Sequence, residues 1–525
     1  MGKTAVAEYV DYATIHGVER IKNSPFAALK ITWLIALCAS LGMITWQVVM
    51  LYQKYDSHPV STSIEMKTVK KMKFPTIVIC NTNPIQYHSF PYTSPLEDPL
   101  NEAAAKYSID REMFESNDSL FTYNYTDFDK IKVPTDFDAD IMVNTAEKFK
   151  MRLSNLSESE LKEFSQPYDT FVLSCTFAGK SCSQSAIGSD STFRTYDYGL
   201  CFVFDPTKQD GISPSGEVSS SGQRYGLELL LNVDQFESVP FVTSSSGVVI
   251  APLYDVGEYL DANAGVFVPT GFQADIAVSK TVTERVPGKN NESPMCDVIS
   301  NASVYDCLRQ CRQENIALRC GCYQQVYLFN KVKDDTDFNE TFDDETRNRA
   351  CLSDEDYVCI IKALDEFTNS TPSECKCISP CREEVYTQDI TLISWPTEKY
   401  LPILRRIITA KLQTGNIGFD RNQIRDNFLL VRVYLKTLSY EVIKESYAYE
   451  IVNFVSDIGG QLGLWAGFSV LSILEIMELV FLLVTKKDNQ TGPEKVDGQI
   501  IKVKKQIQLN SPPMIMVKEI MSTES

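Results

Sequence analysis

Two long apolar runs stand out in the pattern of hydrophobic and polar positions along the 525-residue chain. The first, residues 31–53, contains 23 residues without a charge and lies between Lys30 and Lys54. As a helix it would extend about 35 Å, enough to cross the roughly 30 Å hydrocarbon core of a bilayer. It is too long for the core of a signal peptide, has no small-residue cleavage site and starts late; an uncleaved signal is the alternative. The pattern predicts a first transmembrane helix at residues 31–53.

The second apolar run covers residues 457–485 and ends before a pair of lysines. Residues 458–474 carry no charge, but Glu475 and Glu478 then interrupt a run that is still apolar. A buried helix of a soluble domain is one interpretation. Carboxylates in a helix of membrane length are costly, however, and they usually face an aqueous path or a partner. The run is therefore predicted to be a second transmembrane helix that lines water.

The segment between the two runs has the composition of an extracellular domain. Fourteen of the fifteen cysteines lie there, and only Cys38 lies in the first run. Such an even, clustered set is typical of a disulfide framework built in an oxidising compartment. The segment also contains seven Asn-x-Ser/Thr sequons, which predict glycosylation at Asn117, Asn124, Asn155, Asn291, Asn301, Asn339 and Asn369. Residues 54–456 are therefore predicted to be extracellular.

This topology places residues 1–30 and 486–525 in the cytosol and makes the chain a multi-pass protein of the plasma membrane, surrounded by lipid. The cytosolic flanks carry Arg20, Lys22 and Lys30 before the first run and two lysines after the second, as the positive-inside tendency prefers. Residues 31–474 carry 39 Lys and Arg against 59 Asp and Glu, a net charge of −20. An extracellular domain this acidic attracts cations and cationic ligands.

Local patterns in the extracellular segment predict an α+β domain. Short β-branched or apolar runs bounded by Gly and Pro predict strands at residues 74–80, 199–205, 226–233, 247–255, 265–270 and 429–435. Charged stretches with apolar residues at helical spacing predict helices at residues 97–120, 145–166, 305–313 and 399–412. The sequence has no Gly-rich phosphate loop, nucleophile elbow or metal-ligand pattern, and only three histidines. We expect no enzyme activity, no cofactor, no metal site and no nucleic-acid partner.

The second run contains residues suited to a pore. Gly459, Gly463 and Gly467 recur every four residues and share one helix face, where small residues let membrane helices approach closely. For Gly463, helix packing alone is an equal alternative. Gly467, Phe468 and Ser469 could interrupt the helix midway, so that unwound backbone carbonyls line a water-filled path.

Charge at both ends of the second run points to cations. Asp457 lies at its outer end, and Glu475 and Glu478 lie one turn apart toward its cytosolic end. Rings of carboxylates around a symmetric axis favour cations. One helix cannot enclose a pore, so a channel would need several copies of the chain.

Several motifs together resemble the degenerin/epithelial sodium channel superfamily. They are His16-Gly17, FPTIVICN at 74–81, GVFVPTGFQADIAVSKTVTERV at 265–286, the cysteine cluster at 296–381, and GGQLGLWAGFS at 459–469. The resemblance extends over nearly the whole chain. It implies a homotrimer with a clenched-hand extracellular domain of palm, finger, thumb, knuckle and β-ball, and it implies Na⁺ as the permeant ion and amiloride as a blocker.

The resemblance also assigns roles by position. The pore residues would be the selectivity filter Gly467, Phe468 and Ser469; the outer pore acid Asp457; the lower acidic pair Glu475 and Glu478; and the cytosolic motif His16 and Gly17 that supports the lower pore. The implied disulfides, of which the last five would staple the thumb, are Cys80–Cys201, Cys175–Cys182, Cys296–Cys381, Cys307–Cys377, Cys311–Cys375, Cys320–Cys359 and Cys322–Cys351.

The way the channel opens is the finer question. Residues 79–85 (ICNTNPI) and 226–237 (GLELLLNVDQFE) are most similar to the FMRFamide-gated sodium channels of invertebrates. The acid-sensing branch couples the first helix to the thumb through an aromatic pair. Tyr52 and Tyr55 could supply one side of it, but residues 285–296 contain no aromatic. We therefore expect an FMRFamide-like peptide, whose Arg and free amino terminus suit an acidic domain; its binding residues are unknown.

Other functions remain as alternatives. Acid-sensing and constitutively open channels of the same superfamily come first. An ATP-gated trimeric channel would need a basic cluster for the triphosphate, which Lys67, Lys70, Lys71 and Lys73 could mimic. A non-channel receptor or ectoenzyme would have to explain the carboxylates in the second run, and it offers no reaction centre.

Overall fold

The computed structural model describes residues 18–89, 95–107, 139–253, 265–287, 296, 304–324, 349–369, 375, 377–413 and 419–488. The chain divides into two units, one made of Met1–Pro59 with Tyr449–Ser525 and the other of Val60–Ala448. The larger unit is slightly shorter than the extracellular segment predicted at residues 54–456. The first long helix of the smaller unit ends only at Asp56, and its next helix already begins at Ile451.

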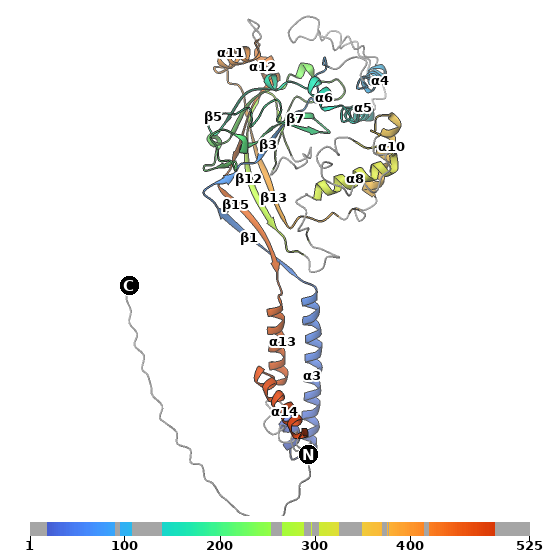
Figure 1. Ribbon diagram of the computed structural model, residues 1–525, viewed down its shortest axis with the longest axis vertical. Helices are drawn as coiled ribbons and strands as arrows, with labels where there is room; N and C mark the ends of the chain where they lie inside the picture. Colours follow the sequence, from blue (N-terminus) through green and yellow to red (C-terminus); the bar gives the residue numbers. More distant parts are fainter. Residues whose placement is uncertain are drawn as a thin grey trace, which may run out of the picture. The chain divides into compact units, whose positions relative to one another are not determined.

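The larger unit is built around β12 (Phe272–Glu284), the central strand of an eight-stranded sheet within the described residues (Figure 1). β13 (Arg382–Ser394) pairs with β12 in antiparallel fashion along its whole length. On the opposite edge, β14 (Phe428–Leu435) pairs in parallel with the first half of β12, and β15 (Ser439–Tyr447) pairs in parallel with the second half. The strand order is β1-β15-β12-β14-β9-β4-β5, in which the further strands are β1 (Val60–Thr68), β9 (Leu227–Asn232), β4 (Val172–Phe177) and β5 (Lys180–Ser181).

A second sheet packs against the first and closes the main core. Its five strands run in the order β11 (Val266–Pro269), β10 (Gly247–Leu253), β3 (Thr76–Asn81), β7 (Gly199–Phe204) and β6 (Thr192–Thr195), and β2 (Met72–Lys73) pairs separately with β8 (Glu217–Val218). Buried side chains from both sheets form one cluster, which includes Ile79, Phe204, Leu229, Ile276 and Val431. Sheets that face each other across such a core are typical of sandwich packing.

Within the described residues some helices pack on a sheet and others on a neighbouring helix. They are α4 (Glu97–Tyr107), α5 (Ala139–Leu153), α6 (Glu158–Phe164), α7 (Tyr168–Phe171), α8 (Val304–Cys320), α10 (Asp354–Asn369), α11 (Leu401–Leu412) and α12 (Arg421–Asn427). α11 and α12 bury Leu404, Ile408 and Ile424 against the first sheet. The expected helices at 97–120, 145–166, 305–313 and 399–412 correspond to α4, to α5 with α6, to α8 and to α11. Residues 108–138 lie outside the described residues.

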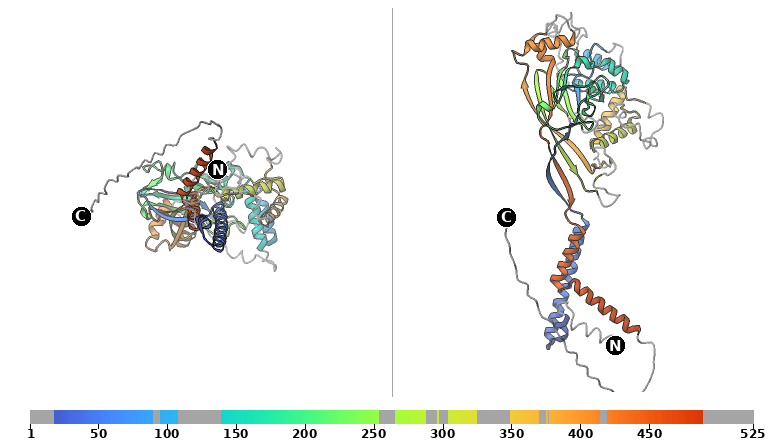
Figure 2. Two further views of the ribbon diagram at one scale, coloured as in Figure 1. Left: turned by 90° about the horizontal axis from the view of Figure 1, so that it is seen from below. Right: turned by 60° about the vertical axis from the view of Figure 1, so that its left-hand side comes forward.

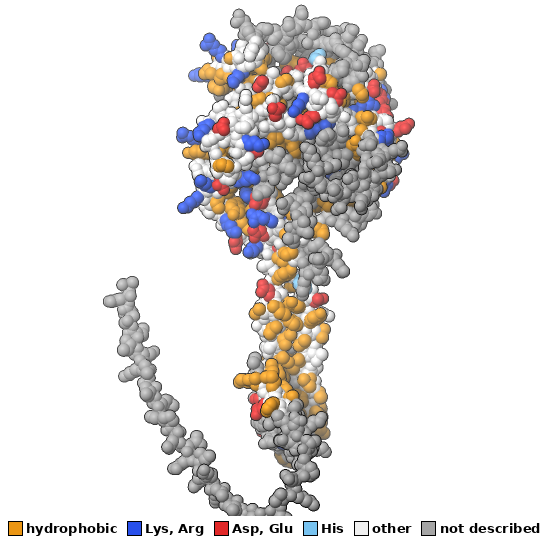
Figure 3. Space-filling model, viewed as in Figure 1, with side chains coloured by type: hydrophobic (Ala, Val, Ile, Leu, Met, Phe, Trp, Pro, Cys, Tyr) orange, Lys and Arg blue, Asp and Glu red, His pale blue; other side chains and the backbone are white. Residues whose placement is uncertain are grey.

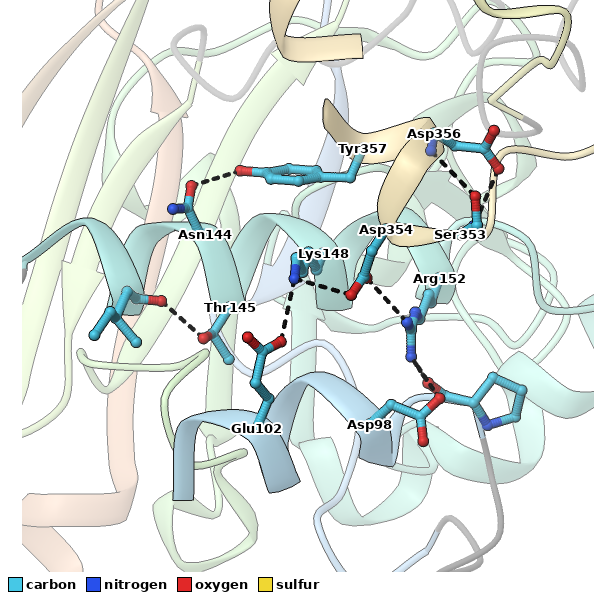
Figure 4. A network of polar contacts seen from close by, with 12 residues as sticks. Asp98, Glu102, Asn144, Thr145, Lys148, Arg152, Ser353, Asp354, Asp356 and Tyr357 are labelled. Atoms are coloured by element: carbon cyan, nitrogen blue, oxygen red, sulfur yellow. Dashed lines mark hydrogen bonds and ion pairs between the residues drawn. The ribbon is translucent and has the colours of Figure 1, made fainter. Parts of the chain in front are cut away.

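Two basic residues of α5 hold α4 and α10 together (Figure 4). Lys148 forms ion pairs with Glu102 of α4 and Asp354 of α10, each at 3.2 Å, and Arg152 pairs with Asp98 at 2.9 Å and with Asp354 at 3.3 Å. Burial opposes the charge on Lys148, but the two carboxylates outweigh it and raise the pKa of Lys148, and the hydrogen bond from Lys148 lowers the pKa of Glu102. Lys148 and Arg152 are largely buried, but the partner carboxylates are 48–73% exposed, so water screens these ion pairs and each contributes little to stability.

Seven disulfides lie in the larger unit, and they are the seven pairs that the family resemblance implied. Two of them, Cys80–Cys201 and Cys175–Cys182, connect strands and turns of the sheets. The other five connect the region of α8 and α10 to itself and to the start of β13; they are Cys296–Cys381, Cys307–Cys377, Cys311–Cys375, Cys320–Cys359 and Cys322–Cys351. Cys38 has no disulfide partner. The region of α8 and α10 is therefore stapled mainly by covalent bonds.

Candidate pore

The first apolar run forms one long helix. α3 (Ala27–Asp56) encloses the predicted span and follows the short α2 (Val18–Asn23). Among the described residues it is the one unbroken helix long and apolar enough to cross a membrane, and a second candidate is a pair of helices joined by a bend. Many hydrophobic side chains of α3, among them Ile31, Leu34 and Ile35, are exposed, and hydrophobic side chains predominate on the visible face of the described helices (Figure 3). The pattern of exposed apolar residues is the one a lipid-facing helix requires.

The second apolar run is broken where the sequence predicted. α13 (Ile451–Ala466) and α14 (Val470–Asp488) meet at a 75° bend across residues 467–469 (Figure 2). Gly467 ends α13 with a left-handed backbone, φ 63°, a conformation that costs glycine nothing. Its N–H donates to the Gly463 carbonyl at 3.0 Å, and the Phe468 N–H donates to the Leu462 carbonyl at 3.2 Å. The break therefore follows from the local sequence.

The break leaves backbone oxygens free and starts α14 with a serine cap. Among the described residues, the carbonyls of Gly467 and Phe468 accept no hydrogen bond. The Ser469 N–H donates to Oγ of Ser472 at 3.1 Å, and the Ser472 N–H donates to the Ser469 carbonyl at 3.0 Å. Unsatisfied carbonyls at membrane depth are tolerated where they line a water-filled path, and they are the oxygens that can replace the hydration shell of an ion. Sequence reasoning missed Ser472, which is fully buried.

Asp457, which is expected to be the outer pore acid, is held by a tyrosine that precedes the helix. The Tyr449 hydroxyl donates to Oδ2 of Asp457 at 2.7 Å, and Nζ of Lys54 lies 4.3 Å from the centre of the Tyr449 ring. Burial and the Asp457 carboxylate raise the pKa of Tyr449 to about 12, so the hydroxyl keeps its proton and remains a donor. Tyr449 lies outside the helical pattern of α13, and the sequence carried no signal for this contact.

The lower acids lie beyond the break. Glu475 and Glu478 are both on α14, one turn apart; Glu478 is exposed and Glu475 is partly buried. The bend thus separates Asp457 on α13 from the two glutamates on α14. Along the second run, the carboxylate of Asp457 comes first, the free carbonyls at the break follow, and the two glutamates come last. This order is suited to a cation path.

Two contacts join α3 and α13. Nε1–H of Trp465 donates to Oε1 of Gln47 at 2.8 Å, and the ring of Tyr55 stacks on Phe454 with centroids 5.1 Å apart. Tyr55 is one of the two aromatics that could have supplied an acid-sensing contact to the thumb. It stacks instead on the second helix.

The glycine face of α13 is uncovered in a single chain. A methyl group built at Gly459 would meet nothing within 4 Å, and at Gly463 it would meet only the Phe468 carbonyl oxygen, at 3.8 Å. Val452, Val455 and Leu464 of the same helix are also exposed. A helix that presents small residues without a neighbour has room for the close approach of another helix.

Most of the remaining expected residues lie outside the described part of the chain. These are His16 and Gly17 and the sequons at Asn117, Asn124, Asn291, Asn301 and Asn339; Asn369 lies at the end of α10, and its side chain is not described. Asn155 is described, and its Nδ2 donates to the carbonyls of Met151 at 2.8 Å and Cys351 at 2.9 Å. The Asn155 amide therefore links the end of α5 to the Cys322–Cys351 disulfide in the folded chain.

Comparison with known proteins agrees with these features. Residues 9–479 match the family model described as amiloride-sensitive sodium channel. The Degenerin-like protein asic-2 of Caenorhabditis elegans is 24% identical over 502 residues, covering 91% of this chain and 86% of the relative. The human Bile acid-sensitive ion channel is 27% identical, covering 89% and 84%. The FMRFamide-activated amiloride-sensitive sodium channel of Cornu aspersum is 24% identical, covering 94% and 86%. Because the family model spans nearly the whole chain, this protein belongs to the amiloride-sensitive sodium channel family, a family of ion channels and not of enzymes.

Proposed function

We propose that three copies of this chain form a Na⁺-selective, amiloride-blocked channel of the plasma membrane that an FMRFamide-like peptide opens. The pore assignment rests on the break at residues 467–469. In this member of a sodium channel family, the break leaves the carbonyls of Gly467 and Phe468 free, between Asp457 on one side and the two glutamates on the other. Gly467, Phe468 and Ser469 form the selectivity filter. Asp457 concentrates cations above the filter, and Glu475 and Glu478 do so below it.

The topology follows from the two spans. α3 is the first, and the bent pair α13–α14 is the second. Residues 54–456 lie outside the cell, and residues 1–30 and 486–525 lie in the cytosol, where His16-Gly17 supports the lower pore. The seven disulfides support this orientation, because disulfides persist in the oxidising extracellular space.

Surfaces left open in one chain support a homotrimer. The glycine face of α13 has no neighbour, and β1 exposes large apolar side chains, with Ile64 67% and Met66 70% accessible. Exposed apolar patches of this kind mark association surfaces. One bent helix cannot enclose a pore, so each of several copies must contribute one.

Three observations support a peptide as the agonist. One relative is a channel activated by FMRFamide. The region between the spans carries a large negative charge, which attracts a ligand with an Arg and a free amino terminus. Tyr55, which could have supplied the first-helix half of an acid-sensing contact, stacks on Phe454.

Acid gating is the second candidate, and a specific residue favours it. Asp234 follows β9, and burial together with the Glu237 carboxylate raises the pKa of Asp234 to about 6. Nδ1 of His88 lies 3.1 Å from Oε2 of Glu237, so three titratable groups are close in this part of the chain. With this pKa, protonation of Asp234 would occur as the pH falls from neutral to about 5.

Whole-cell recording from cells that express this chain alone tests the gating proposal. FMRFamide applied at neutral pH is expected to open a current that amiloride blocks, while a step to about pH 5, below the ordinary His pKa, is expected to give little current. A large transient acid current without any response to amidated peptides would replace peptide gating with acid gating. A steady amiloride-blocked current without a stimulus would mean that the channel is constitutively open.

A further inference from the structure

The segment that follows β12 is tied to the start of β13. The backbone N–H of Arg285 donates to the Cys381 carbonyl at 2.7 Å, and the Arg285 guanidinium donates to the Pro380 carbonyl at 2.9 Å and to Oε2 of Glu383 at 2.7 Å. Cys381 is disulfide-bonded to Cys296. Residues 285–287 are therefore linked through Cys381 and its neighbours to the disulfide-stapled region of α8 and α10.

The same segment is tied on its other side to β15. The β12–β15 ladder ends at the pair Glu284 and Lys444, and side chains continue the connection beyond it. Oε2 of Glu445 accepts from the Val286 N–H at 3.3 Å, and the Tyr447 hydroxyl donates to the Pro287 carbonyl at 2.7 Å. Two side chains of β15 thus form hydrogen bonds with the backbone of residues 286 and 287.

Ion pairs join the ends of β12 and β13 next to this contact. Glu384 of β13 forms ion pairs with Lys280 of β12 and with Arg382, and Arg382 also pairs with Glu284 at 3.3 Å. Burial opposes the charge on Glu384, but its hydrogen bonds from Lys280 and Arg382 outweigh burial and lower the pKa of Glu384. Glu384 therefore stays ionised at neutral pH, and the ion pairs keep the ends of β12 and β13 together. A movement of residues 285–287 would then shift both strand ends as a unit.

β15 is also the last strand before the second span. Tyr447 lies four residues before Ile451, where α13 begins, and two residues before Tyr449, which holds Asp457. β1, which follows the first span, pairs with β15 along its full length and places Val60 opposite Tyr447. Force applied to residues 445–447 therefore acts on the chain that enters the pore helix.

We infer that Glu445 and Tyr447 are positioning residues that transmit movement of the α8–α10 region to the second span, through a clamp formed with residues 285–287. The inference rests on the proposed function in one respect, because it takes the second span to be the pore. The clamp transmits motion by hydrogen bonds to β15, where an acid-sensing channel would use an aromatic contact to the first helix. It is independent of which stimulus moves the α8–α10 region.

Hydrogen–deuterium exchange of the purified full-length channel tests the clamp without any agonist. Tyr447→Phe removes the donor to Pro287 and keeps the ring. Tyr440→Phe, on the same strand, is the matched control, because the Tyr440 hydroxyl has no hydrogen-bond partner among the described residues. In Tyr447→Phe, exchange is expected to rise about fivefold, the factor that corresponds to one ordinary hydrogen bond, both at residues 285–287 and at residues 449–456. Tyr440→Phe is expected to leave both segments at the wild-type rate.

Faster exchange in Tyr447→Phe that is confined to residues 285–287 would overturn the inference, since it would show a local contact without transmission. Equal effects of Tyr447→Phe and Tyr440→Phe would overturn it as well. Glu445→Ala is the second variant and is expected to act in the same direction, while Glu445→Gln, which keeps an oxygen acceptor for the Val286 N–H, is expected to remain near wild type.

Recording with the stimulus that opens the wild type, FMRFamide or acid, gives the functional arm. Tyr447→Phe is expected to need about fivefold more agonist, with an unchanged reversal potential, because the filter is untouched. A wild-type dose response for Tyr447→Phe would contradict the clamp. If the exchange result holds but FMRFamide gives no current, peptide gating fails and the clamp stands.

Discussion

Replacing Asp234 by Asn is expected to stabilise the larger unit at neutral pH. Asp234 is partly buried, and no described residue donates a hydrogen bond or presents a cation to its carboxylate. Its backbone is left-handed, with φ 52°, a conformation that Asn adopts as readily as Asp. Burial and the nearby Glu237 charge raise its pKa to about 6. The substitution therefore removes an unfavourable charge and leaves the shape of the loop unchanged.

The size and pH dependence of the effect follow from linkage. A carboxyl with a raised pKa binds its proton more tightly in the folded state than in the unfolded state, whose value is about 3.8. The ionised group then costs the folded state up to about 3 kcal/mol above pH 6, and this cost disappears as the pH falls below about 4. Asn does not titrate. The gain in stability should thus be full at neutral pH and should vanish at about pH 4.

Thermal unfolding of the detergent-solubilised channel, followed by intrinsic fluorescence, measures this difference. At neutral pH the melting temperature of Asp234→Asn is expected to rise by several degrees, on the order of 5 °C. Asp190→Asn is the control, because Asp190 is exposed and has no partner among the described residues. An equal rise of the melting temperature at neutral pH and at about pH 4, or a lower melting temperature of Asp234→Asn at neutral pH, would refute the reasoning. If acid opens the channel through Asp234, the same variant loses the acid response.

Four further predictions concern the pore and its scaffold. Gly467→Ala should weaken the discrimination of Na⁺ over K⁺ with surface expression kept, because a left-handed backbone costs an L-residue about 1 kcal/mol or more; unchanged reversal potentials in mixed solutions would remove this residue from the filter. Glu475→Gln should lower single-channel Na⁺ conductance, since it removes one charge per subunit, and a wild-type conductance would mean that the carboxylate reaches the cytosolic headgroups instead. Replacing Cys311 and Cys375 together by Ser should cost about 2–4 kcal/mol, seen as a lower melting temperature or lost agonist response; wild-type behaviour of both single variants and the double would contradict this pairing. Asn155→Gln should leave the size of the glycosylated chain on a gel unchanged, because the amide is already engaged, and a faster band would show that this sequon is occupied.

The parts of the fold that the sequence predicted are those in which burial leaves a local pattern. β3, β7, β9, β10 and β14 are covered on both faces or nearly so, and they read as short apolar runs. The break in the second apolar run was predictable because a glycine and a serine interrupt it, and each has a local preference for ending or starting a helix.

The long strands of the central sheet were not predicted. β1 reads VSTSIEMKT, in which Val60, Ile64 and Met66 alternate with polar residues, so it has the period-two pattern of a strand, although it is exposed along nearly its whole length. Its partner β15 is about 380 residues away in the chain, as the Ser63 and Lys444 pair shows. β13 is likewise mostly exposed. The local sequence of such exposed strands does not show which distant strand they pair with.

Contacts between distant segments were also beyond the sequence. The bonds of Glu445 and Tyr447 to residues 286 and 287 join segments about 160 residues apart. The sequon at Asn155 is a second example. Its motif is visible in the sequence, but the hydrogen bond from its amide to the Cys351 carbonyl is not. In both cases the outcome depends on which side chain meets which backbone group in the folded chain.

Reversal potential is the most direct test that the broken second helix forms a sodium path. This chain, purified and reconstituted alone in lipid bilayers, is expected to carry a current that amiloride blocks when its opening stimulus is present. The reversal potential should follow the Na⁺ gradient, shifting by about 59 mV for each tenfold change in Na⁺, and should respond little to K⁺. A reversal potential that follows K⁺ or Cl⁻, or no current with any stimulus from correctly assembled protein, would contradict the account.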